Sequence, residues 1–98
     1  MLGYVICRNK KEAEKISRAL IEKRLIACAN TFSVRSIYRW KTKIVKSNET
    51  AMIVKTNKKN FKKLVKETKK IHSYKIPCII KINSQANTDF DEWAESCM

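Results

Sequence analysis

The order in which hydrophobic periodicities follow one another is the feature that most constrains the fold. Apolar residues recur at helical spacing in two stretches, near residues 10–24 and 57–71, and short runs rich in β-branched residues flank both stretches. Between the two helices, residues 34–41 alternate between apolar and charged side chains, as in a strand with one solvated face. This order predicts an α+β, ferredoxin-like split βαβ fold (βαββαβ) with a further helix after it.

The predicted elements can be bounded from their turn and capping residues. Asn9 and Asn57 are predicted helix N-caps, because each precedes an amphipathic stretch. Residues 72–77 are expected to end the second helix, because Pro77 moves the residue before it out of the α region. The sequence predicts strands over 2–7, 27–40, 49–56 and 78–82, a return arm beginning at 44–45, and a terminal helix from residue 89.

Right-handed crossovers place the four predicted strands in the order 4-1-3-2, each antiparallel to its neighbours. The end of the first strand then lies beside the start of the fourth. We therefore expect Cys7, the turn at His72–Tyr74 and Cys78 at one end of the sheet. Cys28, at the start of the second strand, is expected at the opposite end.

Length and composition exclude several classes of protein. The chain has 98 residues, which predicts one domain over residues 1–98. One Gly and one Pro leave no room for a glycine-rich phosphate or dinucleotide loop. The longest uncharged run, residues 25–34, is half of the roughly 20 residues that a membrane span needs. With no secretory signal pattern and four cysteines lacking a CxxC pair, we expect a cytoplasmic protein that does not bind membranes.

The net charge of +13 is unevenly distributed along the chain. Residues 1–88 hold every basic residue and a net charge of +17, whereas the last ten residues hold four acidic ones. A basic body with this fold makes a nucleic-acid-binding module the alternative function. RNA-recognition domains of this order stack bases on aromatics of their first and third strands. Because residues 51–56 contain no aromatic, nucleic acid is not the favoured partner.

The long hairpin predicts self-association. Residues 34–46 extend beyond what the sheet of so short a chain can cover, so Tyr38 and Trp40 would be half exposed on a monomer. Phe90 and Trp93 on the terminal helix present a similar apolar face. Closing such arms into a ring would remove exposed strand edges, which predicts a homo-oligomer.

No catalytic arrangement is visible in the sequence. The chain has one His, and no nucleophile–base spacing or carboxylate pair stands out, so we predict that it is not an enzyme. A cleft between subunits is the alternative place for a site. The residues expected to line such a cleft are Cys28, Tyr38, Trp40, Lys55 and Tyr74.

Several segments together resemble the CutA family of divalent-cation tolerance proteins. The most specific are an S-x-Y-x-W element at Ser36–Trp40 and an H-x-Y-x-x-P element at His72–Pro77, and the resemblance covers nearly the whole chain. It implies a compact homotrimer, similar to PII-type signal proteins, whose hairpin arms embrace neighbouring subunits. It also implies a role in tolerance of divalent metals, copper in particular. Cys7 and His72 match the positions proposed as copper ligands in the family.

This sequence departs from the family pattern beside those two residues. Lys75 and Cys78 stand where the family has glutamates, and Ser73 stands where it has proline. Losing carboxylates weakens a hard-cation site, whereas an added thiol favours copper or another soft divalent metal. The predicted metal ligands are Cys7, His72 and Cys78. The alternative is that both cysteines are core residues and that His72 caps the preceding helix.

Overall fold

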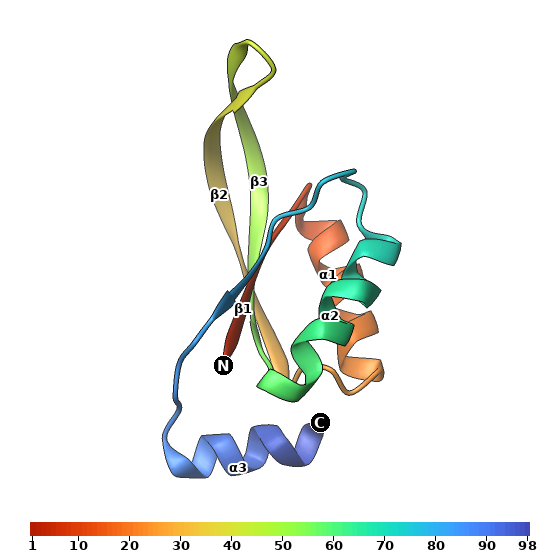
Figure 1. The fold of residues 1–98 in the computed structure, drawn as a ribbon, viewed down its shortest axis with the longest axis vertical. Coiled ribbons are helices and arrows are strands. Elements are labelled where there is room, and N and C mark those ends of the chain that lie inside the picture. Colours follow the sequence, from red (N-terminus) through yellow and green to blue (C-terminus); the bar gives the residue numbers. More distant parts are fainter.

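The computed structural model describes residues 1–98 and confirms the predicted βαββαβ order with a final helix. Its elements are β1 (Leu2–Cys7), α1 (Lys10–Glu22), β2 (Cys28–Trp40), β3 (Lys43–Lys55), α2 (Lys58–Ile71), β4 (Ile79–Ile82) and α3 (Thr88–Cys97). The strands form one sheet in the order β2-β3-β1-β4, with every neighbouring pair antiparallel. This is the predicted strand order. The helices α1 and α2 lie side by side on one face of the sheet (Figure 1).

The core lies between that face and the two helices. Along β1, the side chains of Val5 and Cys7 are fully buried while their neighbours are half-buried, as period two requires. Met52 and Val54 of β3 are buried beside them. The helices contribute their own apolar stripes, chiefly Ile16, Leu20 and Leu64.

Both predicted N-caps are confirmed, and they explain where the helices begin. The side chain of Asn9 accepts a hydrogen bond from the Glu12 N–H at 2.9 Å. The side chain of Asn57 accepts one from the Asn60 N–H at 2.8 Å. Each bond satisfies an N–H that has no partner within its own helix.

The hairpin of β2 and β3 extends well past the rest of the sheet (Figure 1). The two strands pair from Cys28↔Lys55 to Trp40↔Lys43, whereas β1 ends at the pair Cys7↔Thr50. The return arm expected at residues 44–45 is therefore continuous with β3, which begins at Lys43 and not at residue 49. The turn places Lys41 in the left-handed region, at a φ of 57°.

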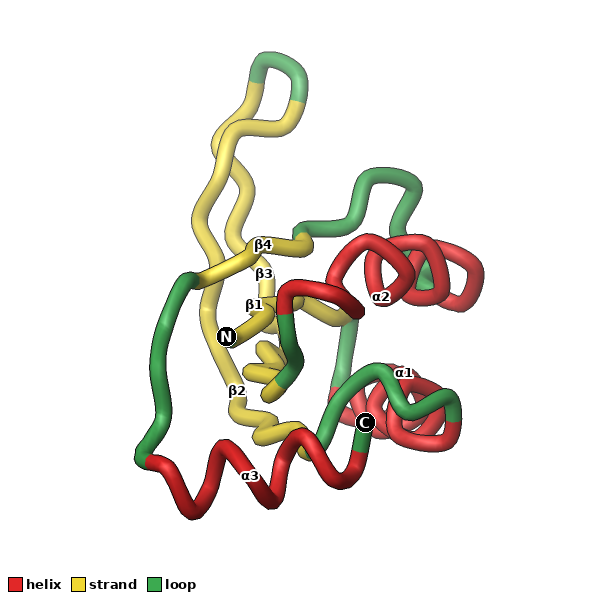
Figure 2. The backbone as a smooth tube through the Cα atoms, turned by 60° about the horizontal axis from the view of Figure 1, so that its bottom comes forward, coloured by secondary structure: helices red, strands yellow, loops and turns green.

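The face of the sheet opposite α1 and α2 carries no helix; we call it the open face. Its residues alternate with those of the core and include Phe32, Ile80 and Ile82, all exposed. Helix α3 lies apart from α1 and α2, at the end of the sheet where β1 begins (Figure 2). Arg24 donates to the carbonyl oxygen of Cys97 and Asn57 donates to the carboxylate of Glu95, which attaches α3 to that end. None of the helices is long and apolar enough to cross a membrane.

Two isoleucines on α1 test the location of the core. Ile16 is fully buried, whereas Ile21 is 45% exposed. We expect Ile16→Ala to lower the free energy of unfolding by about 2–5 kcal/mol, since it leaves a cavity. Ile21→Ala, the matched control, is expected to change it by less than about 1 kcal/mol. Urea unfolding followed by circular dichroism measures both, and equal losses would contradict this placement of the core.

Candidate functional site

Two groups of functional side chains lie at the end of the sheet where β1 finishes, one on each face. Successive strand residues point to opposite faces, so Cys7 points toward the helices and Ile6 toward the open face. The first group is a cluster of Cys7, Glu12 and His72, and the second is a groove on the open face. The two groups share the loop that joins α2 to β4.

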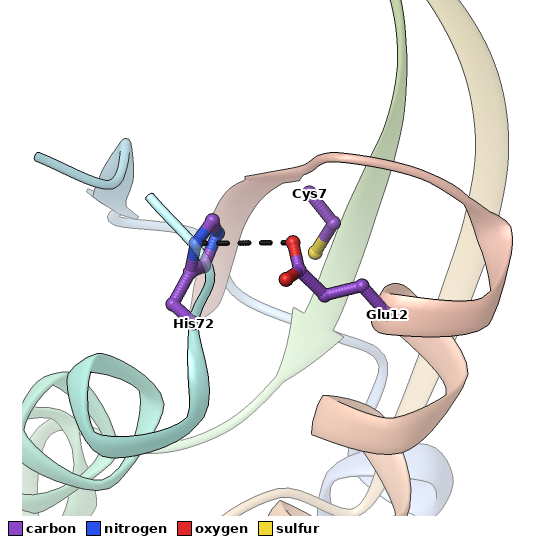
Figure 3. A group of neighbouring side chains, drawn as sticks. All are labelled: Cys7, Glu12 and His72. Carbon is purple, nitrogen blue, oxygen red and sulfur yellow. Dashed lines mark ion pairs between the residues drawn. The ribbon is translucent and has the colours of Figure 1, made fainter. Parts of the chain in front are cut away.

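The Cys7–Glu12–His72 cluster brings together three separate elements (Figure 3). Cys7 ends β1, Glu12 lies in the first turn of α1, and His72 is the C-cap residue of α2. One potential ligand atom from each lies within 4.8 Å of the others. The sequence predicted Cys7 and His72 but missed Glu12.

Both ring nitrogens of His72 are engaged within the protein. Nε2 lies 2.7 Å from the carbonyl oxygen of Ile6, and Nδ1 accepts a hydrogen bond from the Tyr74 N–H at 3.0 Å. The tautomer that suits both contacts has Nδ1 as the acceptor from Tyr74 and Nε2 as the donor to Ile6. The 3.8 Å contact between Nδ1 and Glu12, dashed in Figure 3, is therefore not an ion pair in this tautomer.

Both carboxylate oxygens of Glu12 are also used. Oε1 accepts from the Arg8 N–H and Oε2 accepts from the Ser73 N–H, each at 2.9 Å. Burial opposes ionisation of Glu12, but the hydrogen bonds from Arg8 and Ser73 hold its pKa below the usual value. Glu12 thus ties the β1–α1 connection to the α2–β4 loop.

Cys7 is a buried, protonated thiol. Burial raises its pKa to about 12, and the nearby carboxylates of Glu12 and Glu49 add to the increase. Its Sγ donates to the sulfur of Met52 at 3.5 Å. Metals bind the thiolate form, which this environment strongly disfavours.

In this arrangement the three side chains are engaged in contacts within the protein. The thiol of Cys7 is protonated, and the donor atoms of Glu12 and His72 already accept or donate hydrogen bonds. A metal would have to break these contacts and remove the Cys7 proton. The arrangement instead holds the segment from His72 to Tyr74 in one conformation.

That conformation places Tyr74 at the groove on the open face. The groove has a volume of about 650 Å³ and runs from the hairpin overhang to the α2–β4 loop. Tyr38, Trp40, Glu49, Tyr74 and Cys78 lie among its lining residues. The hydroxyl of Tyr74 donates to Oε2 of Glu49 at 2.5 Å. Burial raises the pKa of Tyr74, and the Glu49 carboxylate adds to the increase.

Cys78 lies on the opposite face of the sheet from Cys7. Its backbone pairs with Ile6, whose N–H donates to the Cys78 carbonyl at 3.2 Å, and residues paired across strands share a face. The predicted metal ligands Cys7, His72 and Cys78 are thus not brought together within one subunit. The sequence analysis placed Cys78 at the correct end of the sheet but did not predict that it lies on the other face from Cys7. Burial, with Glu49 nearby, raises the pKa of the Cys78 thiol.

The five residues predicted to line a cleft divide into two sets. Tyr38, Trp40 and Tyr74 line the groove. Cys28 and Lys55 form a strand pair at the far end of the sheet, where the Lys55 ammonium donates to the side chain of Asn30. One subunit therefore does not assemble all five into one site.

Glu12 makes the stability of the protein sensitive to acid. The pKa of Glu12 is lower in the folded chain than the ordinary glutamate value of 4.5, so its stabilisation is present above that pH and is lost as pH falls through the lower, folded value. We expect Glu12→Gln to cost about 1–3 kcal/mol at pH 7 and to flatten this acid dependence. The exposed neighbour Glu14 supplies the control, Glu14→Gln. The test is the free energy of unfolding of all three proteins, measured from pH 3 to pH 7. If the wild type and Glu12→Gln depend on pH in the same way, the role given to Glu12 is contradicted.

The protonated state of Cys7 also predicts that this residue does not contribute to Zn²⁺ binding by the reduced protein. In competition with a chromophoric chelator at pH 7, Cys7→Ser is expected to bind as much Zn²⁺ as the wild type, within about twofold in affinity. Cys78→Ser, which removes a thiol at the groove, is the comparison variant. Loss of one bound ion per subunit in Cys7→Ser alone would show that the cluster holds metal.

The whole chain is similar to one protein family. The model of the CutA1 divalent ion tolerance protein family matches residues 1–97. The divalent-cation tolerance protein CutA of Thermotoga maritima is 40% identical over 94 residues, which is 95% of this chain and 93% of that protein. Family membership confirms the predicted resemblance and, since the family is not enzymatic, the prediction that the chain is not an enzyme.

Solved structures of CutA proteins are similar to this fold over nearly the whole chain. The CutA structure from Archaeoglobus fulgidus, described as periplasmic, has a TM-score of 0.96 at 37% identity and covers 98% of this chain and 95% of its own. A cytoplasmic location for this chain stays a prediction. The PII-like protein CutA from Nostoc, 21% identical, has a TM-score of 0.90 over 98% of this chain and 94% of its own, which supports the fold alone. The chain belongs to the CutA1 divalent ion tolerance protein family.

Proposed function

We propose that this chain acts as a homotrimer in divalent-cation tolerance and that the open-face groove, completed by a neighbouring subunit, is its ligand-binding site. The observation that carries the proposal is the groove itself, which is lined both by exposed aromatics of the overhanging hairpin and by the hydrogen-bonded pair Tyr74–Glu49. Sites for small molecules are concave, mostly apolar and supplied with a few oriented polar groups.

The open face supports self-association. It presents Phe32, Ile80 and Ile82 to solvent, and the strands at the two edges of the sheet, β2 and β4, have unpaired outer sides. Exposed apolar patches and free strand edges are features that soluble proteins normally cover. Copies arranged around a closed ring would cover both, and the family resemblance points to three copies.

The groove is incomplete on a single subunit. Trp40 is 55% exposed, although its ring forms part of the lining, and no strand of the same chain pairs alongside the outer part of the hairpin. A neighbour packed against the hairpin would bury these side chains and close the groove. The ligand site then depends on assembly, which explains why a loop and a hairpin tip line it.

A soft metal such as copper is the second candidate for the same groove. Cys78 and Glu49 both line it and supply a sulfur and a carboxylate donor. Two donors do not complete the tetrahedral set that such ions commonly require, so a neighbouring subunit would have to provide the others. This candidate keeps the predicted Cys78 ligand but replaces Cys7 and His72.

Sedimentation tests the assembly. We expect the wild type to sediment as three copies of the 11.5 kDa chain at micromolar concentration. Phe32→Asp, which places a charge on the open face, is expected to shift it to monomers because a buried unpaired charge is strongly unfavourable. Ile21→Asp, at a residue of similar exposure on α1, is the control and should stay trimeric. A stable wild-type monomer would overturn the proposal.

Growth tests the role in the cell. In a bacterium that lacks its own CutA protein, we expect the wild-type chain to restore growth at raised copper. Trp40→Ala, which removes part of the groove wall, and Phe32→Asp should restore it about tenfold less well, as a loss of about 1.4 kcal/mol in ligand binding implies. Full protection by both variants would show that neither the groove nor the assembly is needed.

A further inference from the structure

We propose that the ligand of the groove is a small organic cation: an ammonium group carried on an apolar body. This inference rests on the proposed function, because it takes the groove as the ligand site and names the chemistry it selects. It stands on two observations: a nearly buried carboxylate without a basic partner in its own subunit, and aromatic rings that line the same groove.

The carboxylate belongs to Glu49. The residue is only 9% exposed and lines the groove. The side chain accepts one hydrogen bond, from the neutral phenol of Tyr74, and takes part in none of the ion pairs of the chain, which use Glu67. Removing a carboxylate from water is costly unless a cation or several donors compensate. Within one subunit, none of the 22 basic residues forms an ion pair with Glu49, which leaves that position for a ligand.

The aromatic wall suits a positively charged ligand. Tyr38, Trp40 and Tyr74 line the groove, and the faces of such rings attract cations, ammonium groups among them. Ile6, Val45 and Ile76 complete an apolar lining for the remainder of the molecule. Lys75 also lines the groove but is exposed and forms no ion pair with Glu49. The volume of about 650 Å³ suits a compact molecule.

The same features disfavour other ligands. An anion would be repelled by the Glu49 carboxylate, and a neutral molecule would leave the charge of that carboxylate uncompensated. A strongly hydrated metal ion prefers a cage of oxygen donors, whereas this groove offers mainly rings and aliphatic side chains. An organic cation satisfies the carboxylate and the rings together.

Three probes of one shape test the charge preference: benzylammonium, benzyl alcohol and benzoate. They are titrated into the assembled protein carrying Trp93→Phe, so that Trp40 is the remaining tryptophan and reports binding by fluorescence. We expect benzylammonium to bind at least about tenfold more tightly than benzyl alcohol, and benzoate to bind most weakly. Glu49→Gln keeps an acceptor for Tyr74 but removes the charge, so it should abolish this preference. Glu67→Gln, at the ion-paired carboxylate on α2, is the control and should leave it unchanged.

The outcomes separate this inference from the proposed function. Equal binding of all three probes in the trimer would overturn the cation preference and leave the groove as a ligand site. Failure of every probe to bind an intact trimer would overturn both. Binding of Cu(I) that depends on Cys78 and Glu49, with no binding of benzylammonium, would replace the organic cation by the soft metal. If Glu49→Gln loses the preference for benzylammonium and the control Glu67→Gln keeps it, the inference is established.

Discussion

The position of β1 between β3 and β4 is the constraint on which the rest of the structure depends. All six of its residues pair with β3 and four of them also pair with β4, so its alternate side chains are committed to opposite faces. The helix-facing set, including Val5 and Cys7, lies at the centre of the core. The other set, including Ile6, belongs to the open face and the groove.

That alternation also separates structural from functional roles at the end of β1. On the helix face, Glu12 and His72 use their donor and acceptor atoms to hold the α2–β4 loop in place. On the open face, the same loop presents Tyr74 to Glu49. The cluster that resembles a metal site thus supports the loop that carries Tyr74. The proposed ligand site therefore has a fixed geometry in the absence of a ligand.

The hairpin has a different kind of role, because its outer half is stabilised by pairing within the hairpin alone. Beyond the pair Val34↔Glu49, only β2 and β3 contribute backbone hydrogen bonds. A two-stranded ribbon with exposed Ile37, Trp40 and Ile44 is marginal by itself in water. Packing against another copy would stabilise it, which links the proposed assembly to the proposed ligand site.

The sequence by itself determined the order of elements, the strand order, the helix caps and the end of the sheet at which Cys7, His72, Tyr74 and Cys78 gather. These follow from local periodicity and from the handedness of crossovers, both of which act over short stretches of chain. Only the tertiary structure decided which face each residue occupies and which hydrogen bonds each donor atom already makes. The pairing Ile6–Cys78, the contacts of Glu12 with Ser73 and the contact of Glu49 with Tyr74 join residues from 25 to 72 positions apart. Such pairings depend on strand register and on how the loop packs, neither of which any local pattern encodes.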